Sequence, residues 1–393
     1  MTIDGMTGGH PVAPLTPDLG ALASQVTDRT LQIAQVPAPS GGEQKRAAIV
    51  AGWWRDDGFE LVSSDEVGNC WARLRPGRGP ALVLAAHLDT VFSREADHTA
   101  SRAGNRLIGP SVGDNSVALA ALSAVGRLLG SADRGQPVWA LATVGEEGFG
   151  NLAGARHALA HPPVELGALI AVEGNYLGRL GTVGIGSQRW RVVVEGPGGH
   201  AWEQSGAPSA VHEVARIVHA LTSIPTVPGT SSLNVGQLAG GEAINARARR
   251  ASFDLELRGT DEATLAHLDA KARALLSTPL APEMTIEVSD TGRRPAGRVD
   301  AGHPLVHAAR AALAARAFTW REVASSTDAN AAHPLGVPAL ALGVTTGSGE
   351  HTPKEWIDIV PIADGLAILA DTVVRYDQSL RSGAAPADQG EDG

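Results

Sequence analysis

The stretch "PVWALATVGEEGFGN", Pro137 to Asn151, joins an apolar run to two adjacent glutamates. Residues 137–144 have the length and composition of a buried strand. Because neighbouring side chains on an extended backbone point to opposite sides, Glu146 and Glu147 are expected to face different surroundings. A single solvated acidic patch does not account for both, so we expect separate roles for them where the strand leaves the core.

Strands and helices alternate on both sides of this stretch. Strands are predicted over 59–64, 69–75, 81–89 and 165–174, and helices over 116–130 and 152–160. Alternation of this kind is typical of an α/β sheet with helices on its faces. The chain is therefore expected to have an α/β fold built on a mixed sheet, with helices on both faces.

The pattern changes near residue 181. Residues 182–196 alternate like a strand, and a helix, two strands, a helix and a strand follow, over 209–223, 231–241, 245–259, 261–276 and 284–290. The order β-α-β-β-α-β is that of a ferredoxin-like α+β sandwich. We expect an inserted domain over 181–291, and a first domain made of 1–180 and 292–393.

Composition limits the possible functions. With 393 residues, two domains are the default expectation. A net charge of −10 without a Lys/Arg cluster argues against nucleic-acid binding. The single cysteine, Cys70, excludes an internal disulfide and a thiolate cluster, and is expected in a strand. With no signal peptide and no apolar run of about 18 residues, we expect no membrane association and a cytoplasmic protein.

Histidine and acidic residues recur where predicted strands end. They are His87, Asp89, Asp114, Glu146, Glu147, Glu173 and His351. Ligands of open α/β sheets gather at the carboxyl ends of the strands. Imidazoles mixed with carboxylates suit Zn²⁺, with Mn²⁺ or Co²⁺ as alternatives. Three carboxylates leave a single divalent ion with excess negative charge, so the charge count favours two ions and a bridging hydroxide. A one-metal hydrolase stays open.

Each of these residues has a simpler explanation on its own. His87 alone reads as a hydrogen-bonded core histidine, and Asp114 as the N-cap of the following helix. Glu173 alone reads as a solvated loop acid, and His351 as a surface residue. The constellation as a whole favours metal ligation.

The motifs "HLDTV", "GDN", "GEEGFGN", "AVEGN", "GPGGHAW", "GGEAINARA", "STDAN" and "EHTPKEWI" occur in this order along the chain. In this the sequence resembles the dinuclear-zinc metallohydrolases that include glutamate carboxypeptidase, acetylornithine deacetylase, succinyl-diaminopimelate desuccinylase, tripeptide aminopeptidase and aminoacylase. The resemblance implies a zinc-exopeptidase-like catalytic domain and an inserted ferredoxin-like lid and dimerisation domain. It covers nearly the whole chain.

The resemblance also implies roles for individual residues. His87, Asp114 and Glu173 would bind one metal ion; Asp114, Glu147 and His351 would bind the other. Glu146 would be the general base, which gives the two adjacent glutamates their different surroundings. Asp89 shares a strand face with His87 and would hold its ring in the ligating tautomer.

The inserted domain carries a second set of implied roles. In the family, the histidine matching His200 reaches the active site from the partner of a homodimer and stabilises an oxyanion. Arg258 would bind a substrate carboxylate and Asn245 would contact the substrate. The sequence departs from many relatives after Asp114, where it reads "DNSVALA", and after Asn245, where it reads "NARA". These departures concern the loop and the substrate pocket, not the metal ligands.

The expected activity is hydrolysis of an amide bond in a small peptide or N-acyl amino acid, with water bridged by two metal ions. Glu173 is typical of deacylases, whereas the run from "GEEGFGNLAG" to "GPGGHAW" resembles the tripeptidase branch, so a peptidase is favoured. The alternative is a catalytically silent relative that binds a ligand or dimerises. Asp328 and Asn330 either brace the site or form a structural turn. Side-chain or acyl preference, native metal and pathway stay open.

Overall fold

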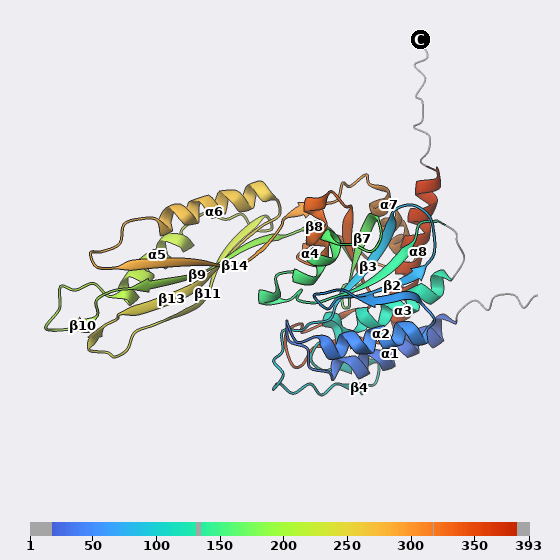
Figure 1. The fold of residues 1–393 in the computed structure, drawn as a ribbon, viewed down its shortest axis with the longest axis horizontal. Helices are drawn as coiled ribbons and strands as arrows, with labels where there is room; N and C mark the ends of the chain where they lie inside the picture. Colours follow the sequence, from blue (N-terminus) through green and yellow to red (C-terminus); the bar gives the residue numbers. More distant parts are fainter. Residues whose placement is uncertain (1–17, 131–134, 317, 383–393) are drawn as a thin grey trace, which may run out of the picture.

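The computed structural model describes residues 18–130, 135–316 and 318–382, which form a larger and a smaller lobe (Figure 1). The larger lobe contains a nine-stranded sheet of order β1-β2-β6-β3-β7-β17-β8-β15, with β16 also paired to β8. Its strands are β1 (Glu60–Ser64), β2 (Cys70–Arg75), β3 (Ala81–His87), β6 (Val138–Thr143), β7 (Leu166–Glu173), β8 (Arg179–Gly184), β15 (Gly297–Arg298), β16 (Arg321–Ser325) and β17 (Ala339–Gly343).

Alternating side chains of the central strands fill two cores, one on each face of this sheet. Leu82 and Leu84 of β3 pack in one core, and Val83 and Ala85 pack in the other. Helices α1 (Leu19–Ala34), α2 (Gln44–Asp56), α3 (Val117–Leu129), α7 (Pro304–Ala315) and α8 (Ile362–Ser382) cover the first face, and α4 (Ala153–Ala160) lies on the second. The predicted α/β fold, with helices on both faces of a mixed sheet, is confirmed.

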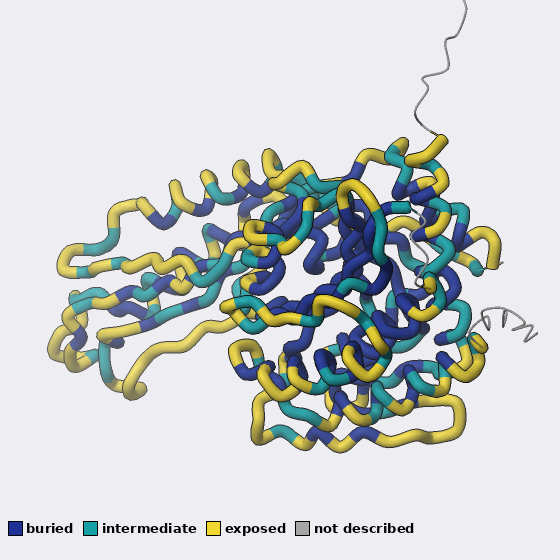
Figure 2. Tube along the Cα trace, turned by 45° about the vertical axis from the view of Figure 1, so that its right-hand side comes forward, coloured by how far each residue is buried: buried dark blue, intermediate teal, exposed yellow. Residues whose placement is uncertain are grey.

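The smaller lobe, residues 186–294, has its own antiparallel sheet of order β11-β13-β9-β14. The strands are β9 (Gly186–Glu195), β11 (Ser231–Gly240), β13 (Arg250–Gly259) and β14 (Thr285–Arg294). Helices α5 (Ala210–Thr222) and α6 (Glu262–Leu276) pack on one face and enclose a separate core around Trp190 and Phe253. This is the predicted ferredoxin-like arrangement. Figure 2 shows long exposed segments along this lobe, whereas buried segments gather in the larger one.

The run 182–196, predicted as one strand, is divided between the two sheets. Residues up to Gly184 belong to β8, and β9 begins at Gly186. Ile185 alone separates the two strands, so the sequence pattern does not reveal that the chain passes from one sheet to the other. The domain limits at 181 and 291 stay a prediction.

A small second sheet links two loops of the larger lobe. A four-stranded sheet of order β18-β19-β5-β4 joins β5 (Arg106–Ile108), which precedes Asp114, to β19 (Trp356–Asp358), which follows His351. Its outer strands are β18 (Gly347–Ser348) and β4 (Ser101–Ala103).

Cys70 is buried in β2, as predicted. No helix of the described residues has both the length and the apolar character needed to cross a membrane.

Candidate functional site

Three neighbouring parallel strands end at the same edge of the large sheet. β3 pairs in parallel with both β6 and β7. His87 is the last residue of β3 and Glu173 the last of β7, and Glu146 and Glu147 follow β6 in the next loop. The order of the strands therefore brings these four side chains to one place, as expected for the carboxyl edge of an α/β sheet.

Asp114 lies between two imidazoles that are far apart in the sequence. Its Oδ1 is 2.9 Å from Nε2 of His87, and its Oδ2 is 3.1 Å from Nε2 of His351. Nε2 of His351 is also 3.4 Å from Oε1 of Glu147. Asp114 precedes α3, and His351 lies in the loop between β18 and β19 with a left-handed φ of 62°.

The five predicted metal ligands form two overlapping groups. Donor atoms of His87, Asp114 and Glu173 lie within 4.8 Å of one another, and so do those of Asp114, Glu147 and His351. Asp114 is common to both groups. A third group within the same distance contains His87, Glu146 and Glu147.

The electrostatics of the cluster favour positive charge beside the carboxylates. Hydrogen bonds to Asp114 and Glu147 raise the pKa of His351 to about 10. Burial lowers the pKa of His87, but its hydrogen bonds to Asp114 and Asp89 outweigh this and the net pKa is well above the ordinary value. Burial and the neighbouring carboxylates raise the pKa of Glu173. The imidazole and carboxylate donors therefore fit a divalent metal ion. A bound ion would supply the positive charge that otherwise comes from protonated side chains.

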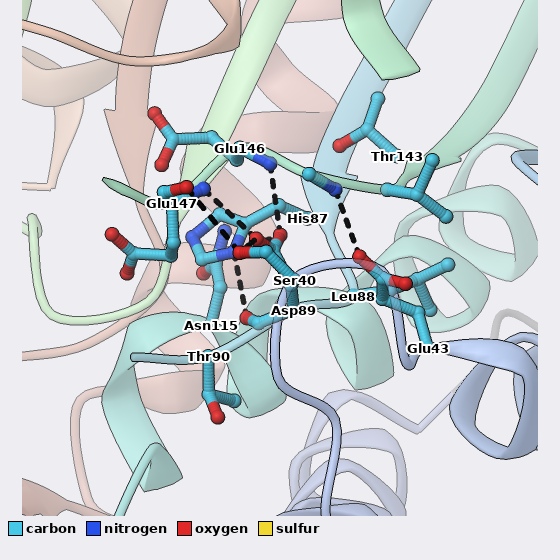
Figure 3. Close-up of polar contacts among 12 residues, drawn as sticks. Ser40, Glu43, His87, Leu88, Asp89, Thr90, Asn115, Thr143, Glu146 and Glu147 are labelled. Atoms are coloured by element: carbon cyan, nitrogen blue, oxygen red, sulfur yellow. Dashed lines mark hydrogen bonds and ion pairs between the residues drawn. The ribbon is translucent and has the colours of Figure 1, made fainter. Parts of the chain in front are cut away.

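Asp89 holds the loop that carries both glutamates. It is fully buried, and its carboxylate accepts hydrogen bonds from the backbone N–H groups of Glu146 and Glu147 at 3.0 and 2.9 Å. Ser40 Oγ donates to the same carboxylate at 2.6 Å. Figure 3 shows Asp89 beneath the loop, with the Glu146 and Glu147 side chains pointing in different directions.

The contact between Asp89 and His87 differs from the one predicted. Nδ1 of His87 lies 3.0 Å from the backbone oxygen of Asp89 and 3.5 Å from its carboxylate. The backbone carbonyl, not the carboxylate, is therefore the closer partner of the ring. Ser40, 49 positions away in the sequence, was not predicted.

Glu146 is buried and pairs with an arginine that sequence reasoning missed. Oε1 of Glu146 accepts a hydrogen bond of 2.8 Å from Nη1 of Arg294, which comes from β14 of the smaller lobe. Burial raises the pKa of Glu146 to about 8, although the charge of Arg294 acts in the opposite direction. Glu146 is therefore a buried carboxylate whose negative charge is opposed by the guanidinium of Arg294.

Two further buried residues, Glu355 and Arg46, bind the backbone next to predicted metal ligands. Oε1 of Glu355 accepts hydrogen bonds from the backbone N–H groups of Gly113 and Asp114, at 2.9 and 2.7 Å. Arg46 is fully buried and donates to the backbone oxygen of Leu88 and to Ser111 Oγ. Neither residue was predicted. The partners of Glu355 are more than 240 positions away, and Arg46 reaches Leu88 and Ser111 across 42 and 65 positions.

A cavity of about 460 Å³ contains this cluster. All five predicted metal ligands and Glu146 line it, together with Arg189 and Arg258 of the smaller lobe. The guanidinium of Arg258 is bound to Glu256 through Nε at 2.8 Å and Nη2 at 3.0 Å. Arg189 contacts the same carboxylate at 2.8 Å. The predicted carboxylate-binding arginine therefore reaches the cavity already paired.

His200 and Asn245 lie elsewhere in the chain. His200 is exposed in β10 (Gly199–His200), which pairs with β12 (Ala246–Arg247) at the far end of the smaller lobe (Figure 1). The backbone oxygen of Asn245 accepts a hydrogen bond of 2.8 Å from Ala201 N–H. The structure therefore brings His200 and Asn245 near each other, but neither lines the cavity of its own chain.

Asp328 and Asn330 brace the site as well as form a turn. Oδ2 of the buried Asp328 accepts a hydrogen bond of 2.6 Å from Thr143, the last residue of β6. The side chain of Asn330 donates to the backbone oxygens of Ile185 and Pro295, where the two strands connecting the lobes pass. Asp328 therefore braces the strand that leads to Glu146, and both residues lie in a short 3₁₀ turn, Asp328–Ala331.

The sequence profile described as peptidase family M20/M25/M40 matches residues 83–375. A comparison with curated protein sequences found no match. Among solved structures, aminopeptidase PepT of Bacillus cereus ATCC 10987 has a TM-score of 0.73 at 18% identity, covering 90% of this chain and 98% of that one. A tripeptidase of Staphylococcus aureus subsp. aureus Mu50 has a TM-score of 0.74 at 18% identity, covering 92% and 99%.

The YxeP protein of Bacillus subtilis, described as a dinuclear metal-binding peptidase from the M20 family, has a TM-score of 0.66 at 15% identity. The alignment covers 91% of this chain and 99% of that one. At these identities the structural likeness establishes the shared fold, in agreement with the architecture described above.

Proposed function

Since the chain belongs to peptidase family M20/M25/M40 and is a metal-dependent hydrolase, we propose that it cleaves an amide bond of a small peptide or N-acyl amino acid. A peptidase is favoured, because the similar solved structures include a tripeptidase and an aminopeptidase over nearly their whole length. The observation that carries the proposal is the convergence of the five predicted metal ligands and Glu146 in one cavity.

Two divalent ions, proposed to be Zn²⁺, fit the two donor groups that share Asp114. His87, Asp114 and Glu173 would hold one; Asp114, Glu147 and His351 would hold the other. When bound, such ions lower the pKa of water and polarise a carbonyl group. The third donor group includes Glu146, but the positive charge of Arg294 at 2.8 Å makes this carboxylate the least suited to a cation. This supports Glu146 as base instead of ligand.

Glu146 would act as general base. Its carboxylate would take a proton from the attacking water and pass it to the amide nitrogen as the C–N bond breaks. Burial raises the pKa of this carboxylate, whereas the positive charges of Arg294 and of bound metal ions act in the opposite direction. Asp89 would keep Glu146 in place through the backbone N–H groups that it binds.

The substrate end of the cavity is rich in arginine. Arg179 joins Arg189 and Arg258 in its lining, and Glu256 is the shared partner of the last two. Two guanidiniums facing one carboxylate leave net positive charge, which supports binding of a substrate with a free carboxylate. Arg258 would bind that carboxylate.

His200 and Asn245 would complete the site from a second copy of the chain. In one chain both lie at the far end of the smaller lobe and outside the cavity. A homodimer formed through the smaller lobe would place the exposed His200 of one subunit over the cavity of the other. There it would stabilise the oxyanion that develops on the carbonyl oxygen.

The test combines metal analysis with a panel of dipeptides, tripeptides and N-acetyl amino acids. We expect about two ions per chain and cleavage of short peptides with a free carboxylate. A protein that holds two ions and cleaves no member of the panel would favour the silent, ligand-binding relative. A stoichiometry near one ion per chain would favour a one-metal hydrolase.

A further inference from the structure

Arg294 connects the smaller lobe to the proposed general base. It is the last residue of β14 and pairs in register with Ser187 of β9, so its backbone belongs to the smaller lobe. Its side chain nevertheless lies in the larger lobe, and only 5% of the residue is exposed. Nη1 donates to Oε1 of Glu146 at 2.8 Å and lies 3.1 Å from Ser326 Oγ, while Nη2 donates to the backbone oxygen of Glu146.

These contacts hold Glu146 at two points. One nitrogen of the guanidinium holds a carboxylate oxygen and the other holds the backbone carbonyl of the same residue. Because the guanidinium is planar and rigid, this pair of contacts restricts both the loop and the side-chain rotamer. Glu146 also places a carboxylate oxygen within 4.8 Å of donor atoms of His87 and Glu147, so its orientation decides how it faces the reacting groups.

Breaking this pair by removing one partner is costly where it lies. Both side chains are buried, with 6% and 7% of their surface exposed, and a buried guanidinium without its carboxylate carries a large desolvation cost. Arg294 also lines the cavity, so direct binding of substrate is the competing role. Its two terminal nitrogens, however, already contact Glu146 and Ser326, and this argues against direct binding of substrate by Arg294.

We propose that Arg294 is a positioning residue that sets the orientation of the Glu146 carboxylate and so couples the last strand of the smaller lobe to the reaction. The proposal rests on the proposed role of Glu146 as base. It predicts that changes at Arg294 act on the chemical step and leave substrate and metal binding in place.

The experiment compares Arg294→Ala and Arg294→Lys with the wild type and with Arg293→Ala. Arg293 is the preceding residue on the same strand, and its exposed side chain pairs with Glu262, so it is the matched control. We expect kcat of Arg294→Ala to fall about 100-fold, the size of effect that a misplaced catalytic group produces. KM and metal content should stay near wild type, and Arg294→Lys should recover part of kcat.

Added guanidinium at non-denaturing, millimolar concentration gives a second readout. It should restore part of kcat in Arg294→Ala, since the deleted group leaves a space beside Glu146, and should do nothing for Glu146→Ala. A folded Arg294→Ala with unchanged kcat, or with only a raised KM, would overturn the proposal. If Arg294→Ala does not fold, the kcat of Arg294→Lys decides: a wild-type value overturns the proposal.

The two proposals fail in distinguishable ways. An active Glu146→Ala variant would overturn the assignment of the base itself. An inactive Glu146→Ala variant together with a fully active Arg294→Ala variant would overturn the role of Arg294 alone.

Discussion

Glu355 accepts a hydrogen bond of 2.7 Å from the backbone N–H of Asp114, a residue 241 positions earlier in the chain. Through this contact the loop that carries His351 is tied to the segment that carries the aspartate shared by both donor groups. The position of Asp114 therefore depends on a residue that has no donor atom in any of the groups.

Glu355→Ala should weaken metal binding and lower the melting temperature. It leaves two buried N–H groups without an acceptor, at a cost of about 1–3 kcal/mol each. Glu355→Gln keeps an oxygen in the same place and should stay close to wild type. Titration with Zn²⁺ and thermal unfolding of both variants measure the difference. Equal metal affinity in Glu355→Ala and the wild type would contradict the prediction.

Glu146→Ala should remove turnover and leave the metal content intact. Loss of a general base typically lowers the rate by about 10²- to 10⁴-fold. Metal analysis and kcat of the purified variant are the measurements, and Glu146→Gln is the control that preserves the shape of the side chain. Substantial activity in either variant would disprove the assignment.

Asp114→Ala should lose both metal ions, because Asp114 belongs to both donor groups. Glu173→Ala should lose only one of the two, since Glu173 belongs to one group. Elemental analysis after dialysis distinguishes the variants. Retention of one tightly held ion by Asp114→Ala would contradict the proposal that Asp114 binds both ions. Removal of metal from the wild type with a chelator should abolish activity, and added Zn²⁺ should restore it.

A subunit with His200→Ala and one with Glu146→Ala should complement each other if His200 acts in the partner's site. In such a heterodimer one of the two cavities combines an intact Glu146 with an intact His200, so about half of the wild-type activity is expected. Coexpression with two different tags and sequential purification isolates the heterodimer. If His200 acts within its own chain, both cavities are defective and the heterodimer is inactive.

His333 gives a pH dependence of stability that is separate from the metal cluster. Burial lowers its pKa to about 4, so the folded protein keeps this side chain neutral. Between the unfolded pKa of about 6.5 and the folded one, the unfolded state binds more protons. The contribution of neutral His333 is therefore fully present above this window and is lost as the pH falls through it.

Urea unfolding at pH 7.5 and pH 5 tests this prediction. The wild type should lose more stability between the two pH values than His333→Asn does. His307→Asn, at an exposed histidine, should lose as much as the wild type. An identical loss in all three proteins would mean that burial does not hold His333 neutral.

Much of the fold and of the metal cluster follows from local patterns in the sequence. His87 and Glu173 each close an apolar run, and parallel strands bring such ends together without further information. The β-α-β-β-α-β order of the smaller lobe is likewise a sum of local periodicities. Asp114 and His351 lie in glycine-containing loops instead, so the pattern marks them as candidates and the motif resemblance assigns them to the two ions.

The supporting residues were beyond the reach of such patterns. Arg294 reads locally as a charged strand end, and its partner Glu146 is 148 positions away. Glu355 is hidden in the same way, since its partners Gly113 and Asp114 are more than 240 positions away. The pairing of Arg258 with Glu256 was predictable from the sequence. Glu256 lies two residues earlier on the same strand, so the two side chains share a face and pair.

Strand β17 lies between β7 and β8, although those two follow each other closely in the sequence. A nascent chain leaving the ribosome therefore carries β7 and β8 with unpaired inner edges until more than 150 further residues have been made. Open strand edges favour aggregation, so this interval is the vulnerable stage of biosynthesis. The same delay means that a chain interrupted before β17 lacks His351 and cannot assemble both donor groups.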